Sequence, residues 1–345
     1  MSRKLKNIGE QALIQRIVHL CSPVSKYRSP SLKALTENGD DAFVAKLASD
    51  GALVFSTDTM VEGTHFNPGW IKRYLSEKEA WKAIGHKIMA VNLSDLASMG
   101  NVDPILALVT IGLNGDISVD SVDNLYTGML NLAKKQCFEI AGGDVIRADK
   151  SIVSVTIVGR MSSGRILRRS GAATGDVLMV SGPIGLSSAG LKILKNRVKW
   201  DRSLVRTLLE WHLFPMPCIQ AGKILASEAI MATSCMDLSD DLVSSLEILG
   251  KKSRVGFEVE LGNVPVAGPL REFCRRNRSD PMEHILYGGE DYQLLFTVKP
   301  ARVGRVIQKI PGAFVLGSVR DARHGIQFKK NSVPVRMRDS RFRHF

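Results

Sequence analysis

The chain has 345 residues, of which 44% are hydrophobic and 23% are charged, and its formal net charge is +13. This length predicts two domains of roughly 150 residues or more each, and the composition is that of an ordinary globular protein. Basic residues occur in short runs without interleaved aromatic side chains, which make up only 6% of the chain. The charge therefore favours a basic surface or attraction of small anionic substrates, and we expect no nucleic-acid partner.

The predicted elements alternate irregularly between helices and strands, which favours an α/β fold of the α+β kind. In chain order, the first half predicts a helix at 8–20, a strand at 53–58, a helix at 77–99, a strand at 105–113, a helix at 118–135 and strands at 138–144 and 151–160. A basic, glycine-rich stretch at 161–176 follows and predicts a boundary between domains at 1–162 and 163–345. NLSDLASM at 92–99 faintly resembles DLSDDLVSS at 237–245, which raises the possibility of two related halves.

The five cysteines have irregular spacing and no CxxC pair, so we expect reduced thiols and no sulfur-based metal site. No signal peptide is visible, and the longest apolar stretch, at 104–113, is too short to span a bilayer. We therefore expect a cytoplasmic protein that has no membrane partner.

Carboxylates repeatedly end apolar runs or follow glycines. They are Asp41, Asp58, Asp95, Asp144, Asp237, Asp240 and Glu290. Because a lone buried carboxylate is costly, such a set predicts a shared partner, and Mg²⁺ prefers oxygen ligands. Single members have simpler explanations: Asp240 with Ser239 could cap a helix near Leu242, Asp144 could stabilise its own turn, and Asp95 could pair with a basic neighbour.

Mg²⁺ in proteins usually bridges carboxylates to substrate phosphates, so phosphoryl transfer is the reaction class that the set favours. The glycine pairs at 142–143 and 288–289 would let the backbone approach phosphate oxygens closely. The sequence has neither a G-x-x-x-x-G-K-[ST] loop nor the HRD and DFG motifs, so it belongs to neither common kinase class.

Seven motifs together resemble the thiamine-monophosphate kinase family, in its order and over most of the chain. They are GDDAFV at 39–44, STDTMVEGTHF at 56–66, NLSDLASMG at 92–100, GGDV at 142–145, RSGAATGD at 169–176, MDLSD at 236–240 and YGGEDYQLLF at 287–296. GEQALI at 9–14 and FRHF at 342–345 also fit the two ends of that family.

The resemblance implies a two-domain fold of the aminoimidazole ribonucleotide synthetase-like superfamily. Its N-terminal domain would have a mixed sheet that forms a homodimer, followed by a C-terminal α/β domain. ATP and several Mg²⁺ ions would lie in the cleft between them. The implied activity is ATP-dependent phosphorylation of thiamine monophosphate to thiamine diphosphate by direct in-line transfer.

The resemblance also implies roles for individual residues. The implied metal ligands are Asp41, Ser56, Thr57, Asp58, Asp95, Asp144, Asp237 and Asp240, of which Asp58, Asp95 and Asp240 are implied to be catalytic. The implied ATP contacts are Gly143, Asp144, Arg169 and Ser239, and the implied thiamine-phosphate contacts are His65, Glu290 and Phe342. Without the resemblance, His65 would be interpreted as an ordinary loop histidine and Phe342 as a tail residue.

Two departures from the family stand beside the implied site. Asp241 occupies a position where the family usually has glycine, and Val145 replaces threonine after Asp144. If the backbone at Asp241 needed a positive φ, the turn and the metal affinity could both change.

Two alternatives remain. One is another ATP-using relative in the superfamily: a purine-biosynthesis synthetase, a selenophosphate synthetase or a hydrogenase-maturation protein. The other is a non-catalytic binding protein with a basic surface.

Overall fold

The computed structural model describes residues 32–35, 40–47, 51–196 and 200–335. The helix predicted at 8–20, the two terminal motifs and Phe342 lie outside the described residues. Among the described helices, none is long and apolar enough to cross a membrane.

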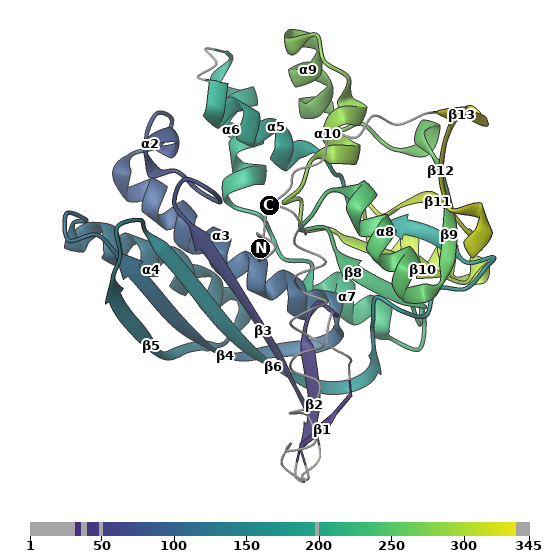
Figure 1. Cartoon of the computed structure of the whole chain (residues 1–345), viewed down its shortest axis with the longest axis horizontal. Coiled ribbons are helices and arrows are strands. Elements are labelled where there is room, and N and C mark those ends of the chain that lie inside the picture. The colour runs from purple at the N-terminus through teal and green to yellow at the C-terminus, as the bar shows by residue number, and fades with distance from the viewer. Residues whose placement is uncertain (1–31, 36–39, 48–50, 197–199, 336–345) are drawn as a thin grey trace, which may run out of the picture.

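The first half forms a mixed sheet with strand order β1-β2-β3-β6-β4-β5, in which only β4 and β5 pair in parallel. Its strands are β1 (Leu32–Ala34), β2 (Phe43–Leu47), β3 (Ala52–Val61), β4 (Gly100–Leu113), β5 (Glu139–Arg147) and β6 (Ile152–Ile166). Its helices are α2 (Pro68–Ile71), α3 (Glu77–Ser98) and α4 (Val119–Gln136). Figure 1 shows α3 lying across the sheet, between it and the second half of the chain.

The second half forms a sheet with strand order β13-β12-β9-β11-β7-β10-β8. Its strands are β7 (Val177–Val180), β8 (Ser234–Asp237), β9 (Val255–Glu260), β10 (Leu294–Val298), β11 (Phe314–Asp321), β12 (Ile326–Lys330) and β13 (Val333–Val335). Its helices are α5 (Leu186–Asn196), α6 (Arg202–Leu213), α7 (Ile219–Ala226), α8 (Leu242–Ser253), α9 (Gly268–Asn277), α10 (Pro281–Tyr287) and α11 (Val303–Lys309), with short 3-10 turns η3 (Leu261–Asn263), η4 (Pro300–Arg302) and η5 (Ala322–His324).

The predicted fold class is confirmed, and several predicted elements extend further than expected. The strand predicted at 138–144 does not end at its aspartate but continues to Arg147, and the strand predicted at 105–113 begins before Pro104, at Gly100. The two similar motifs lie in different local structures, because 92–98 is helical in α3 whereas 237–245 joins β8 to α8. The domain boundary near residue 162 stays a prediction.

Helix α3 positions the site, and its own sequence fixes where it begins. The Ser76 side chain accepts a hydrogen bond from the Glu79 backbone N–H, and the Glu79 side chain accepts one from the Ser76 backbone, which together form a capping box. Trp81, Ile84, Ile88 and Leu93 are almost fully buried. The helix therefore packs on most sides against the sheet, α4 and the second half of the chain.

One face of the first sheet, which we call the open face, is not covered by any helix of the described residues. Side chains alternate along a strand, so Thr57 and Thr59 point away from the face that α3 covers, whereas Ser56 and Asp58 point toward it. On the open face Leu108 is 45% exposed and Ile146 is 49% exposed. This part of the sheet therefore offers apolar surface to solvent.

Two glycines let α3 and α4 approach closely. A Cβ at Gly128 would lie 2.0 Å from the Lys82 carbonyl oxygen, and one at Gly85 would lie 1.9 Å from the Leu125 carbonyl oxygen. Neither contact is possible for a real side chain, so both positions require glycine unless the two helices separate.

We predict that Gly128→Ala lowers the free energy of unfolding by about 1–3 kcal/mol, because the added methyl group forces α4 away from α3. Helix propensity alone would give the opposite sign, since alanine favours a helix over glycine by about 1 kcal/mol. Gly304→Ala in α11 is the matched control, because nothing lies within 4 Å of its added Cβ. Denaturant unfolding that found Gly128→Ala as stable as Gly304→Ala would contradict this packing.

Candidate active site

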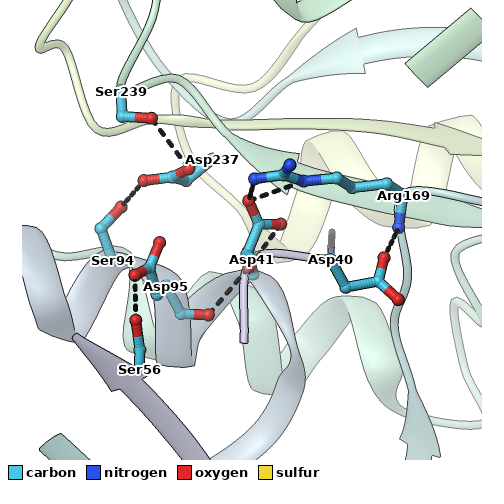
Figure 2. Close-up of polar contacts among 9 residues, drawn as sticks. Asp40, Asp41, Ser56, Ser94, Asp95, Arg169, Asp237 and Ser239 are labelled. Atoms are coloured by element: carbon cyan, nitrogen blue, oxygen red, sulfur yellow. Dashed lines mark hydrogen bonds and ion pairs between the residues drawn. The ribbon is translucent and has the colours of Figure 1, made fainter. Parts of the chain in front are cut away.

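Three carboxylates from separate parts of the chain converge between the two sheets. Asp41 precedes β2, Asp95 lies on α3, and Asp237 is the last residue of β8. One oxygen from each lies within 4.8 Å of the others. Figure 2 shows the three side chains pointing toward one another. We call Asp41, Asp95 and Asp237 the acid cluster.

Serine hydroxyls hold the acid cluster in place. On α3, Ser94 donates to Asp237 at 2.7 Å and Ser98 donates to Asp41 at 2.9 Å, while Ser56 of β3 donates to Asp95. Ser94, Asp95 and Ser98 share one stripe of the helix because residues three and four apart are neighbours. A single turn of α3 therefore orients all three carboxylates.

Arg169 brings positive charge against the acid cluster. Its Nε is 2.9 Å from Asp41 Oδ1, and its Nη2 forms an ion pair with the same oxygen. Its backbone N–H donates to Asp40 Oδ1 at 3.0 Å. The Arg169 side chain is only 20% exposed, so it is a fixed part of the site.

One arginine does not balance the buried negative charge. Burial raises the pKa of Asp95 well above its ordinary value, and the neighbouring carboxylates of Asp58, Asp237 and Asp41 raise it further. Burial, followed by the charge of Asp41, raises the pKa of Asp237 to about 8. A group of close oxygen ligands that repel one another fits a divalent cation such as Mg²⁺, which takes oxygen ligands and would neutralise the repulsion.

A pocket of about 410 Å³ opens onto these groups. It is lined by Asp40, Asp41, Ala42, Phe43, Phe55, Ser56, Thr57, Asp58, Asp95, Arg169 and Ser239. Asp58 lies beside Asp95, and burial raises its pKa as well. Ser239 Oγ is 3.4 Å from Asp237 Oδ1. Most of the residues predicted for metal and ATP therefore share one polar pocket.

Three predicted residues are placed differently. Thr57 has its hydroxyl on the open face of the sheet, 3.0 Å from Thr156 Oγ1, so only its backbone can face the pocket. Asp240 is exposed after β8 and does not line the pocket. Asp144 is exposed on β5, where its Oδ1 accepts from its own neighbour, the Val145 N–H, at 2.9 Å.

The edge strand β5 lies away from the acid cluster. It is three strands from β3 in the sheet, which corresponds to about 14 Å at the usual strand spacing. Gly143, predicted to contact ATP, has a packing role here, because a Cβ would lie 1.7 Å from the Val109 carbonyl oxygen. Within one copy of the chain, Gly143 and Asp144 therefore do not join the site.

The residues predicted for thiamine phosphate lie in two loops. His65 Nδ1 accepts from the Val61 N–H at 3.1 Å, so its proton is on Nε2. Glu290 has a left-handed backbone, with φ 62°, and its carboxylate is 2.8 Å from Lys87 Nζ.

Sequence reasoning missed four polar residues of this region: Lys87, Ser94, Ser98 and His212. The signal was available for three of them, because Lys87, Ser94 and Ser98 interrupt one otherwise apolar stripe of the helix at spacings of seven and four residues. His212 on α6 carried no comparable pattern.

Asp241 does not belong to the acid cluster. Its backbone has φ −67°, so the position needs no glycine, and its side chain accepts from the Ser244 N–H at 2.8 Å. Asp241 is thus the N-cap of α8, a role that Asp fills well. The cap at this helix is Asp241, and neither Ser239 nor Asp240 provides it.

Comparison with known proteins agrees with this geometry. Residues 39–161 match the family model "AIR synthase related protein, N-terminal domain", and residues 173–329 match "AIR synthase related protein, C-terminal domain". Thiamine-monophosphate kinase from Aquifex aeolicus (strain VF5) is 33% identical over 91% of this chain and 96% of that protein. Thiamine-monophosphate kinase from Escherichia coli (strain K12) is 32% identical over 98% of both. The chain belongs to the thiamine-monophosphate kinase family.

Solved structures support the same placement. AaThiL complexed with AMPPCP and TMP has a TM-score of 0.82 and 28% identity, with both chains covered completely. Hydrogenase maturation protein HypE in complex with ATP has a TM-score of 0.67 at 18% identity, covering 93% of this chain and 94% of that one, which shows the fold alone. The predicted family and enzyme class are confirmed.

We predict that the metal-free protein loses stability as pH rises from 5 to 8, and that Mg²⁺ reverses this loss. Above pH 5 the unfolded chain has already released these carboxyl protons, whereas Asp95 and Asp237 retain them in the folded state because their folded pKa values are raised. Thermal unfolding should therefore show a larger stabilisation by Mg²⁺ at pH 8 than at pH 5.

Asp95→Asn is the control for this prediction, because it removes one buried carboxylate and lessens the repulsion on Asp237. Its metal-free stability should depend less on pH between 5 and 8, and Mg²⁺ should stabilise it less. An equal Mg²⁺ shift at both pH values, or an unchanged shift in Asp95→Asn, would contradict the acid cluster as a metal site.

Proposed function

We propose that this enzyme phosphorylates thiamine monophosphate to thiamine diphosphate with ATP, by direct in-line transfer at a site that holds several Mg²⁺ ions. The observation that carries the proposal is the acid cluster beside Arg169. Bound Mg²⁺ supplies charge neutralisation for the phosphates. The carboxylates of Asp41, Asp58, Asp95 and Asp237, with Ser56, would hold it. The cation and the carboxylates neutralise each other's buried charge, so burying both together costs little free energy.

The remaining residues of the pocket suit the nucleotide. Arg169 can offer two N–H groups to phosphate oxygens once Mg²⁺ takes over the charge of Asp41. Ser239 offers a hydroxyl at the same edge. Asp240, exposed next to Ser239, is in a position to meet a metal ion that arrives with the nucleotide.

The cysteine near the site is poorly suited to form a covalent phosphoryl intermediate, which favours direct transfer. Burial raises the pKa of the Cys218 thiol, and the charge of Asp237 raises it further, so this thiol is a poor nucleophile. The four cysteines that the structure describes are free, which suits the cytoplasmic location that we propose.

We also propose a homodimer in which each site is completed by the other copy. Among the described residues, β2 pairs only with the Ala52–Phe55 part of β3, which leaves Ser56–Val61 with one free edge. Among the strands that the structure describes, β5 is the last of this sheet, and it carries Gly143 and Asp144. We propose that β5 of one copy lies against this part of β3 in the other, which would bring Gly143 and Asp144 of one copy to the acid cluster of its partner.

The alternatives are less well supported. Relatives such as HypE share the fold at 18% identity, whereas the kinases match at above 30% over nearly the full length. A non-catalytic basic binding protein would have no need to keep the acid cluster, whose carboxylates repel one another without a cation.

Purified protein should form thiamine diphosphate from thiamine monophosphate only with both ATP and Mg²⁺, as measured by product chromatography. We predict that Asp95→Asn reduces turnover by about 10³-fold or more, because it removes charge that the transition state needs, while the far-ultraviolet circular dichroism stays unchanged. No diphosphate from the wild-type protein at saturating Mg²⁺, or near-normal turnover in Asp95→Asn, would overturn the proposal.

Complementation between inactive variants tests the dimer. Asp95→Asn and Asp144→Asn should each be inactive alone, and co-expression should restore about a quarter of wild-type turnover. Half of the dimers are then mixed, and each mixed dimer has one intact site. If Asp144 instead served the site of its own copy, every site in the mixed dimers would carry one substitution and no activity would return.

A further inference from the structure

A second buried charged group lies behind Glu290, apart from the acid cluster. Lys87 of α3 is 2% exposed and His212 of α6 is 3% exposed. Lys87 Nζ is 2.8 Å from Glu290 Oε1, and His212 Nδ1 is 3.5 Å from Glu290 Oε2. The Glu290 side chain is 28% exposed, so the carboxylate is held from behind and is open on one side.

The contacts of His212 determine its tautomer. An ammonium group can only donate, so His212 Nε2, at 3.4 Å from Lys87 Nζ, must be the acceptor nitrogen. The ring proton therefore lies on Nδ1, where it faces Ser187 Oγ at 3.0 Å and Glu290 Oε2 at 3.5 Å. Burial, followed by the charge of Lys87, lowers the pKa of His212 to about 3, so the ring is neutral and Lys87 is the cation of the group.

This environment keeps Glu290 ionised. Burial raises the pKa of Glu290, but the charge of Lys87 and its hydrogen bond to the carboxylate outweigh burial and bring that pKa below its ordinary value. Stability alone gives no reason for the arrangement, because apolar side chains of similar volume usually serve a core at least as well as a buried ion pair. Its consequence is a charged carboxylate with a fixed orientation at the edge of the site.

The place of Lys87 on α3 relates this carboxylate to the acid cluster. Lys87 and Asp95 are eight residues apart on one helix, which corresponds to about 12 Å along its axis. Ser94 lies on the same stripe and contacts Asp237. An extended small phosphate ester could thus place its phosphate near the acid cluster and its other end near Glu290.

We infer that Lys87 and His212 are positioning residues that fix the Glu290 carboxylate against the cationic, thiazolium-bearing end of the acceptor. The inference rests on the proposed function. It assigns selection of the acceptor to a group that α3 and α6 hold together, separate from the pocket that takes ATP and Mg²⁺.

Steady-state kinetics of Lys87→Met, with both substrates varied, tests this role. We expect KM for thiamine monophosphate to rise about 10- to 100-fold, the usual effect of losing a group that orients a ligand-contacting residue, while KM for ATP changes less than about twofold. Lys223→Met is the matched control, because Lys223 also forms an ion pair between the two halves of the chain, with Asp103, but lies away from Glu290. It should change neither KM.

The pH dependence of KM for thiamine monophosphate distinguishes a positioning role from a purely structural one. Without Lys87, burial dominates and the pKa of Glu290 rises, so KM for thiamine monophosphate should begin to increase at a higher pH on acidification than in the wild type. A parallel rise in both KM values, or an unshifted pH profile, would overturn the inference. Absence of turnover in the wild type would instead overturn the proposed function.

Substitutions of His212 give an independent test should Lys87→Met fail to fold. His212→Asn keeps an N–H donor near the position of Nδ1 and should retain a KM for thiamine monophosphate close to the wild type. His212→Leu removes the donor and should raise that KM selectively. Equal effects of the two substitutions on both substrates would contradict a positioning role.

Discussion

The close approach of Asp41, Asp95 and Asp237 is the constraint on which the rest of the structure depends. Their oxygens lie within 4.8 Å of one another, and burial keeps two of these carboxyl groups protonated to an unusually high pH. A fold would not hold such groups together for stability, because they repel one another once ionised. Packing elsewhere in the chain must therefore impose the arrangement.

Helix α3 supplies that packing. Its apolar sides are clamped by the sheet and by α4, so close that Gly85 and Gly128 cannot carry side chains. The helix therefore cannot rotate, and its polar stripe stays directed at the acid cluster. On that stripe, Ser94 and Ser98 donate hydrogen bonds to carboxylates from both halves of the chain. The same rigidity carries Lys87 to Glu290. The apolar contacts of the helix fix its position, so its polar stripe can hold mutually repelling groups close together without displacing the helix.

Much of this could be predicted from the sequence, and the limits are physical. Ordered motifs and apolar periodicity were enough for the two-part α/β fold, for α3 and for the convergence of Asp41, Asp58, Asp95 and Asp237 with Arg169. Strand alternation, which decides the face of Thr57, requires the register of β3, and the sequence alone does not provide it. The distance of Asp144 from the cluster depends on strand order, which local patterns do not encode. Lys87 was overlooked because a lysine in a helix is usually solvated.

Asp241 shows that a departure from a family pattern need not add a residue to the acid cluster. A carboxylate gained at this point of the sequence suggests an additional ligand for a cation, but side-chain direction depends on the backbone. At φ −67° this residue points along α8 and satisfies the orphan N–H of Ser244. Asp237, four residues earlier, ends β8 and points into the cluster. The transition from strand to helix between them thus separates a carboxylate of the acid cluster from one that caps a helix, although both have the same charge.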